Sequence, residues 1–407
     1  MKTAAVFGTF DVANYGDCLF PLLTRWRLER LGFDVVPVSP TSSAVPWRDA
    51  LRPMAVEAFM RGERPVDAVL VGGGSIIHRS AVKLPDYQQG NMRAWAYLSL
   101  WLGAALAAST QEVPLIWNAP GVPLPFDADA PPAVPLAISA ASYLSVRDAA
   151  SAANLPEGFA PAIMPDSAVE VAQMWPRESL TPVFRDMLAQ SGLDAGSRVA
   201  VFHAKARAVQ AEGEEAVAAR IATFCRDNGV VPALVAIGPC HGDDTLAASL
   251  GERIGGALLL LDRARELREI AALIAHAEVF VGASLHGYIT AFSYCVPAVL
   301  VAQPAIAKFD GFLGHAGRKE DAVGSWEQAM AAAAERLGKR GPAFGPSPAL
   351  LDAVEAHWAR IADALASSPS EKQRQFMAAY LRDRMSADGI DAALLPFVAP
   401  RRRKSAA

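Results

Sequence analysis

The chain has 407 residues, of which 52% are hydrophobic and 20% charged, with a formal net charge of −4 and a pI near 6.0. This composition is typical of a globular protein of two or three domains and argues against disorder on a large scale. The slight negative charge gives no general attraction to nucleic acid, so we expect no nucleic-acid partner, and local groups must hold any anionic ligand.

The spacing of the cysteines and the length of the apolar segments argue against several further classes of protein. The four cysteines are far apart and show neither a CxxC nor a His-rich spacing, so neither a disulfide framework nor a metal site is expected. The first residues predict a strand running into a turn rather than a signal peptide, and we expect a cytoplasmic protein. The most apolar segment, residues 94–108, is shorter than the ~20 residues that span a bilayer and predicts a buried helix.

The chain opens with a predicted strand over residues 3–8, a polar loop, and a helix over residues 18–31 for which Asp17 is the expected N-cap. A second strand completes a βαβ unit. No G-x-G-x-x-G occurs there, which disfavours NAD or FAD, and we expect no cofactor. The loop also contains Asn14 and Gly16, which a simple helix cap would explain equally well.

A glycine triplet follows the next predicted strand. The apolar run over residues 66–71 predicts a buried strand, and Gly72, Gly73, Gly74 and Ser75 come directly after it. A turn without side chains lets the main chain come close to a ligand. We therefore expect this turn to border a binding site.

Two more turns follow strands in the first half of the chain. Arg147 lies at the carboxyl end of a short predicted strand, where its guanidinium can clamp a carboxylate or phosphate through two hydrogen bonds. The plain alternative is a surface ion pair with Asp148, which is expected to begin a helix. Asp166 lies in a Pro-Asp turn after another apolar strand. A connector rich in Pro and Gly over residues 175–197 then predicts a domain boundary.

The second half alternates strands and helices from residue 198 onward, which predicts a second α/β sheet. Its most informative stretch is residues 273–312, where the turn Ser-Leu-His-Gly over residues 284–287 separates a strand from a helix. Ser284 is the expected N-cap. Anions favour helix N-termini at the carboxyl ends of parallel strands, so this turn suits an anionic ligand. The plain alternative is that His286 only caps its own helix and binds no ligand.

After residue 312 the chain is expected to form loops and then helices over residues 326–337, 350–365 and 371–385, with no further strand. The basic stretch Arg401 to Lys404 is expected to be a solvated tail. Peripheral association with the inner face of a membrane is the alternative for this tail, because clustered basic residues attract anionic lipid.

The order N-x-G-D, glycine triplet, S-x-R-D-x-x-S, Pro-Asp turn, S-L-H-G and Lys308 resembles the signature of the polysaccharide pyruvyl transferase family over roughly residues 5–315. The resemblance implies an α/β protein of two Rossmann-like domains facing a cleft, similar to the glycosyltransferase B architecture, with C-terminal helices. The implied division is an acceptor-side domain over residues 1–180 that contributes Arg147, a donor-side domain over residues 195–345, C-terminal helices over residues 346–400 and a basic tail over residues 401–407.

The family carries a pyruvyl group from phosphoenolpyruvate to a sugar of a polysaccharide or glycan precursor and forms a ketal, so these two substrates are the implied partners. The resemblance implies that His286 and Arg147 are catalytic. Imidazole has an ordinary pKa that suits a general acid near neutral pH. The implied donor-binding residues are Ser284, Leu285, Gly287 and Lys308. The other implied cleft residues are Asn14, Gly16, Asp17, Gly72, Gly73, Gly74, Ser75 and Asp166.

Two departures from the family pattern keep other functions open. Ser284 stands where many family members have Arg, and His78 and Arg79 follow the glycine triplet where members often carry an acidic residue. The alternatives are a nucleotide-sugar-dependent glycosyltransferase, with His286 against a diphosphate, and a catalytically silent relative that binds a glycan or phosphate. Three further cations, Arg79, Lys205 and Arg207, lie near predicted strand ends, and the sequence does not rank them as anion-binding residues.

Overall fold

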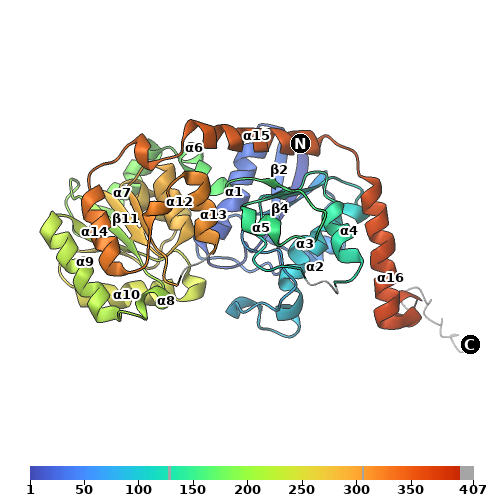
Figure 1. The fold of residues 1–407 in the computed structure, drawn as a ribbon, viewed down its shortest axis with the longest axis horizontal. Helices are drawn as coiled ribbons and strands as arrows, with labels where there is room; N and C mark the ends of the chain where they lie inside the picture. Colours follow the sequence, from blue (N-terminus) through green and yellow to red (C-terminus); the bar gives the residue numbers. More distant parts are fainter. Residues whose placement is uncertain (127–129, 305–306, 395–407) are drawn as a thin grey trace, which may run out of the picture.

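The computed structural model describes residues 1–126, 130–304 and 307–394. The predicted basic tail at residues 401–407 and the last residues of the predicted C-terminal helices lie outside these ranges. Two α/β halves lie side by side along the long axis of the molecule, and the helices at the end of the chain run back over the first half (Figure 1).

The first half is built on a parallel five-stranded sheet in the order β3-β2-β1-β4-β5. The strands are β1 (Lys2–Phe7), β2 (Phe33–Ser39), β3 (Met54–Ala55), β4 (Ala68–Gly72) and β5 (Leu115–Asn118). Its helices are α1 (Tyr15–Glu29), α2 (Val56–Met60), α3 (Met92–Thr110), α4 (Ala133–Ser139) and α5 (Ala149–Ala153). The last four residues of β1 are fully buried, as a continuous apolar run in a central parallel strand predicts.

A small parallel pair, β6 (Ser145–Val146) and β7 (Ala162–Ile163), extends this half beyond β5. The pair is joined to β5 through a bridge between Ile116 and Tyr143. The apolar segment at residues 94–108 lies within α3, whose inner face is buried. Within the described ranges, no helix is long and apolar enough to cross a membrane.

The second half contains a parallel six-stranded sheet in the order β10-β9-β8-β11-β12-β13. The strands are β8 (Val199–His203), β9 (Val231–Val235), β10 (Leu259–Leu261), β11 (Val279–Gly282), β12 (Ala298–Val301) and β13 (Ala322–Val323). Its helices are α8 (Ala206–Val209), α9 (Glu214–Asn228), α10 (Asp243–Ile254), α11 (Leu267–Ala275), α12 (Leu285–Ser293), α13 (Ala307–Ala316) and α14 (Trp326–Arg336). The expectation of no strand after residue 312 was wrong, because β13 has only two residues and so no readable pattern.

The connector between the halves is mostly helical. It comprises α6 (Val171–Met174) and α7 (Arg177–Gln190), and α7 packs on α11 of the second half. The Phe184 ring stacks on His276, and the Nε atom of Arg177 donates to the Ala275 carbonyl at 3.1 Å. The connector is therefore bound to the second half rather than hanging between the two.

The C-terminal helices return to the first half (Figure 1). Helix α15 (Pro348–Leu365) crosses from one half to the other, and α16 (Glu371–Leu394) lies along α3 and α4. Nε2 of His357 lies 2.8 Å from Oδ1 of Asn118, and Nδ1 lies 2.9 Å from the Tyr143 hydroxyl. Phe376 joins the apolar core around α3. The core of the first half is thus completed by the end of the chain.

A buried ion pair marks the crossing of α15, and we call this contact the α15 junction. Arg27 of α1 is paired with the fully buried Glu170 and with Glu355 of α15. Nε of Arg27 donates to Oε1 of Glu170 at 2.8 Å, and Nε1 of Trp358 donates to Oε2 of the same carboxylate at 2.7 Å. Every charge at this junction therefore has a partner.

Candidate functional site

The Ser-Leu-His-Gly turn lies at the carboxyl end of β11, as predicted. Ser284 is the N-cap of α12, and its Oγ atom accepts a hydrogen bond from the Gly287 amide at 3.3 Å. Leu285 is buried in the core. A Cβ atom on Gly287 would lie 2.5 Å from the Ile237 side chain, so this position has no room for a side chain. The turn is held rigidly by its own packing.

His286 reaches from this turn into the first half of the molecule. A Cβ atom built on Gly16 would lie 1.8 Å from Nδ1 of His286, and the Phe20 ring meets the imidazole edge-on at 5.5 Å between centroids. Nε2 of His286 lies 3.5 Å from Oδ2 of Asp166, beyond an ordinary hydrogen bond. Among the described residues, this buried nitrogen has no hydrogen-bond partner.

The N-x-G-D loop carries the other side of this contact. Oδ1 of Asn14 accepts from the amides of Gly16 at 3.1 Å and Asp17 at 3.5 Å, so the N-cap of α1 is Asn14. The expectation that Asp17 caps this helix was wrong, because the helix begins three residues earlier than predicted. The side chain of Asp17 does not cap the helix, and it interacts instead with Thr9 and with the charges of His286 and Lys308.

Main-chain hydrogen bonds join the same loop to the second half. The Tyr15 amide donates to the Ile237 carbonyl at 2.9 Å, and the Cys240 amide donates to the Ala13 carbonyl at 3.2 Å. We call these two bonds, together with the contact of Gly16 on His286, the site junction. It fixes the beginning of α1 against the loop after β9 and the turn after β11.

Two carboxylates of the first half flank His286. Burial raises the pKa of Asp17, although His286 and Lys308 oppose this shift. Burial would also raise the pKa of Asp166, but the nearby His286 imidazole outweighs it and holds that pKa below its ordinary value. The two carboxylates therefore differ in proton affinity, which suits one for carrying a proton and the other for remaining charged.

Arg147 lies at the end of β6 and is only 9% exposed. Its Nη2 atom donates to Oγ of Ser75 at 2.8 Å, and its Nε atom donates to Oδ2 of Asp148 at 3.2 Å. The pair with Asp148 exists, as the plain alternative expected, but it is buried. Asp148 also caps α5. A Cβ atom on Gly121 would lie 2.6 Å from the guanidinium, so main chain covers one of its faces.

The glycine triplet forms the turn beneath Arg147. Gly72 ends β4, and Gly73 and Gly74 have φ values of 63° and 71°, in the left-handed region that favours glycine. A Cβ atom on Gly73 would lie 2.2 Å from the Phe20 ring. This turn therefore needs glycine both for its backbone conformation and for its packing on α1, as well as for any approach to a ligand.

Lys308 lies in the first turn of α13, where the sequence had suggested a loop after β12. Burial, and then the charges of Lys205, Arg147 and Arg207, lower the pKa of Lys308 to about 7. The same helix reaches the first half, because Nε2 of His315 lies 3.0 Å from the Arg147 carbonyl. Cations from both halves thus face one region, which is the electrostatic pattern of an anion site.

Sequence reasoning missed a buried pair beside this region. Nε2 of His203, at the end of β8, lies 2.8 Å from Oδ2 of Asp243, and both side chains are buried. The position of His203 at a strand end was the available signal, but the sequence could not show that Asp243 turns toward it. In the part of the chain that the structure describes, no cluster of three or more His, Cys, Asp or Glu side chains could hold a metal ion.

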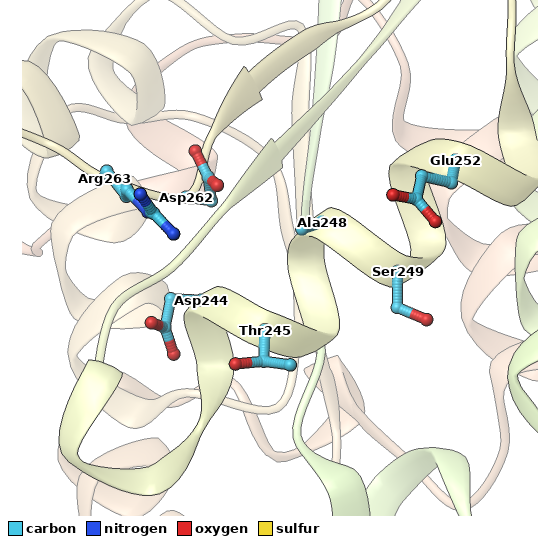
Figure 2. A pocket seen from close by; sticks show the side chains of 7 residues that line it. All are labelled: Asp244, Thr245, Ala248, Ser249, Glu252, Asp262 and Arg263. Atoms are coloured by element: carbon cyan, nitrogen blue, oxygen red, sulfur yellow. The ribbon is translucent and has the colours of Figure 1, made fainter.

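A separate hollow of about 310 Å³ lies along α10, and none of the residues described above lines it. Figure 2 shows its lining, in which Asp244, Glu252 and Asp262 accompany a single cation, Arg263. Three carboxylates against one guanidinium disfavour an anionic ligand. The strand ends around His286 and Arg147 are therefore the better candidate for anion chemistry.

A family model described as "Polysaccharide pyruvyl transferase" matches residues 14–303 of the chain. No curated protein matches the chain. Solved structures share its fold at low identity. The S. aureus MnaA–UDP co-structure has 13% identity and a TM-score of 0.52, over 91% of this chain and 99% of that one.

Two other solved structures have similar values. The UDP-GlcNAc 2-epimerase of Methanocaldococcus jannaschii has 13% identity and a TM-score of 0.52, over 88% of this chain and 99% of that one. The UDP-N-acetylglucosamine 2-epimerase of Rickettsia bellii has 10% identity and a TM-score of 0.51, over 96% and 99%. At such identities the likeness shows the fold alone. The expected α/β architecture, with two parallel sheets in a glycosyltransferase B-like arrangement and C-terminal helices, is confirmed.

Proposed function

Because the chain belongs to the polysaccharide pyruvyl transferase family, we propose that it transfers a pyruvyl group from phosphoenolpyruvate to a sugar of a polysaccharide or glycan precursor and forms a ketal. The observation that carries this proposal is the meeting of both halves at the strand ends. His286 of the second half lies against Gly16 and near Asp166 of the first. Arg147 and Lys308 bring positive charge from either half to the same region.

Phosphoenolpyruvate presents a carboxylate and a phosphate, and this site offers groups for both. The Arg147 guanidinium is held in one orientation by Ser75 and Asp148, so it can clamp an anion at little cost in side-chain entropy. Lys308 adds a second cation, and the first amides of α12 attract negative charge. In this scheme the second half is the donor side and the first half is the acceptor side, lending Arg147 across the gap.

The reaction begins with a proton. His286 gives a proton to the methylene carbon of phosphoenolpyruvate, which forms a methyl group and leaves an oxocarbenium centre at the neighbouring carbon. One sugar hydroxyl attacks that centre and releases its proton to a carboxylate base. A second sugar hydroxyl then attacks the same carbon, the bond to the phosphate oxygen breaks, and phosphate leaves with that hydroxyl's proton. The base returns its proton to His286, which restores the enzyme.

Asp17 is our choice for this base and Asp166 for the group that orients the imidazole. Burial raises the pKa of Asp17, so this carboxylate takes up a proton more readily than an exposed one. Asp166 is held in the charged form and faces Nε2 of His286. A carboxylate in that position favours one ring orientation and stabilises the protonated ring.

We place this reaction in the cytoplasm, where phosphoenolpyruvate is made. Peripheral contact of the molecule with the inner face of a membrane would bring it to a lipid-linked acceptor. The basic stretch at residues 401–404 motivates this part of the proposal.

Mass spectrometry of acceptor glycans tests the proposal. A panel of lipid-linked and nucleotide-linked glycans is incubated with the full chain and phosphoenolpyruvate, and the expected result is a pyruvyl mass increment on one acceptor class together with released phosphate. His286→Ala serves as the control for enzyme-dependent transfer. Donor competition separates the rival function, because protection of the chain by a nucleotide sugar but not by phosphoenolpyruvate would indicate a glycosyltransferase.

Hydrogen exchange tests the shared site directly. Saturating phosphoenolpyruvate should slow amide exchange in the turn at residues 282–290 and also around Arg147, because both halves contribute to binding. Protection confined to one half would contradict a donor site shared between them.

A further inference from the structure

Two cations lie beyond the end of β8, next to the proposed donor site. Strand β8 pairs with β11, and in this register Gly282 is opposite His203. Ser284 and Lys205 each come two residues later, so the Ser-Leu-His-Gly turn and Lys205 leave neighbouring strand ends. Arg207 follows within α8. Neighbouring strands lie about 4.8 Å apart, so both cations lie close to the proposed donor site without belonging to its turn.

The buried pair described above fixes this part of the rim. Oδ2 of Asp243 lies 2.8 Å from Nε2 of His203 and accepts from the Gly238 amide at 2.8 Å. Asp243 thereby ties the end of β8 to the loop that follows β9, which carries the exposed His241. These contacts hold the Asp243 carboxylate in place.

The cations of this rim have no close counter-ion among the described residues, because no carboxylate lies within ion-pair distance of Lys205 or Arg207. The charge of Asp243 acts on both cations, and on His241, at longer range. Burial, followed by the charges of Lys205 and Lys308, lowers the pKa of His241. The positive charges of Lys205 and Arg207 therefore disfavour a proton on His241, and an anion bound among these groups would offset the repulsion and favour that proton.

We propose that Lys205, Arg207 and His241 form a second anion subsite, which binds the diphosphate of an acceptor sugar. This inference rests on the proposed function, in which Arg147, Lys308 and the first amides of α12 hold the two anionic groups of phosphoenolpyruvate. The cations after β8 are then left for another anion. A sugar diphosphate fits, because its two linked phosphates can contact groups on two neighbouring strand ends of the second half, while its sugar extends past His286 to the acceptor side in the first half.

Calorimetric titration of the full chain with inorganic pyrophosphate tests the subsite. The expected result is that pyrophosphate binds to protein already saturated with phosphoenolpyruvate. Lys205→Gln and Arg207→Gln should each weaken pyrophosphate about 10–100-fold, the usual effect of removing a charged hydrogen-bond donor. Lys372→Gln, an exposed cation on α16, is the matched control and should bind pyrophosphate like the wild type.

Two results would overturn the subsite. Competitive displacement of phosphoenolpyruvate by pyrophosphate would mean that one anion site serves both. Unchanged pyrophosphate affinity in both Lys205→Gln and Arg207→Gln would remove these residues from binding. Failure of the proposed function gives a different result, in which phosphoenolpyruvate does not bind while pyrophosphate binding still depends on Lys205. Thermal unfolding of each variant checks that the fold is intact.

The source of the diphosphate is distinguished by two further probes. Uridine diphosphate that binds more tightly than pyrophosphate supports a nucleotide-linked acceptor, and tighter geranyl diphosphate supports a lipid-linked one. Equal affinity of all three supports recognition of the diphosphate alone. Failure of both organic diphosphates to bind would overturn the assignment to a sugar diphosphate.

Discussion

The two junctions between the halves connect the same domains with opposite chemistry. At the α15 junction a buried arginine meets two carboxylates and an indole, and each polar group has a partner. At the site junction the contacts are two main-chain hydrogen bonds and a glycine pressed on an imidazole, and Nε2 of His286 is left without a hydrogen bond. The first arrangement is typical of a structural contact and the second of a functional site.

The difference suggests that the α15 junction contributes mainly to stability and the site junction mainly to the reaction. Changes at the α15 junction should lower the stability of the fold and spare the chemistry of each folded molecule. Changes at the site junction should lower the rate and spare the stability.

Replacing His286 with Ala should lower kcat by about 10²–10⁴-fold, the usual contribution of a general acid. The free energy of unfolding should change little, because no hydrogen bond to the ring's buried nitrogen is lost within the described structure. Phosphate release on a confirmed acceptor measures the rate, and chemical denaturation measures the stability. Wild-type turnover in this variant would remove His286 from the mechanism.

Replacing Glu170 with Ala should destabilise the fold by about 3–5 kcal/mol, because Arg27 would keep a buried charge and lose its buried partner. Glu355→Ala is the matched control, since the Glu355 side chain is 57% exposed and its pair should contribute about 1 kcal/mol or less. Urea denaturation compares the two. If the two variants lose equal stability, burial is not what gives this junction its strength.

Replacing Gly16 with Ala should lower kcat by about 10²-fold, the scale of a small misplacement of a catalytic group, because the new methyl group would occupy the place of the His286 ring. Gly103→Ala is the control in α3, where the nearest side-chain atom to a new Cβ would be at 3.6 Å. That variant should keep its rate and gain up to about 1 kcal/mol of stability from helix propensity. Full activity of Gly16→Ala would show that the imidazole can move without loss.

Replacing Arg147 with Lys should weaken phosphoenolpyruvate binding by about 10–100-fold, because an ammonium cannot reproduce the planar fork held by Ser75 and Asp148. Arg226→Lys, on the exposed face of α9, is the control. Isothermal titration with phosphoenolpyruvate compares them. Equal affinity of Arg147→Lys and wild type would reduce the arginine to its pair with Asp148.

The smallest effect concerns pH. The pKa of Lys308 is about 7 in the folded chain, so the amine loses its charge as pH rises through that value, and a bound anion would restore the proton. Affinity for phosphoenolpyruvate should therefore fall above pH 7, by up to about tenfold per unit. Lys308→Arg should remove this fall, because a guanidinium stays charged. A pH-independent wild-type affinity would contradict a role for Lys308.

The same shift has a defined sign for stability. An unfolded chain keeps the Lys308 proton up to its ordinary pKa of 10.5, whereas the folded chain releases it near 7. Because the unfolded state binds more protons between these values, the contribution of Lys308 to stability rises with pH across this window. Denaturation of wild type and Lys308→Arg at pH 7 and pH 9 measures the difference.

Much of the fold was predictable because parallel strands are continuous apolar runs that end in recognisable turns. The strand before Ser284 and the cap at that residue were correctly placed, as was the helix starting after Asp148. Strand β13 escaped prediction because two residues carry no periodicity. Asn14 and Asp17 are both good caps, and the sequence could not decide between them.

The candidate site was predictable as a set of turns and unpredictable as a set of contacts. Sheet topology sends strand ends to one edge, so Arg147 and His286 could each be assigned to a rim. The packing of Gly16 on His286 joins residues 270 positions apart and depends on how two separate sheets dock. No periodicity within either half contains that information, and the same holds for His203 with Asp243.

The return of α15 and α16 to the first half also sets the order in which the two halves can fold during synthesis. All strands of the second-half sheet, and the helices α8 to α14, have been synthesised once α14 leaves the ribosome. Asn118 and Tyr143 still await His357, and the core around α3 still awaits Phe376. The half that is made first is therefore finished last. A nascent chain would pass through a stage in which its later domain is mature and its earlier one still exposes an apolar face, which makes the last helices the point at which chaperone binding should end.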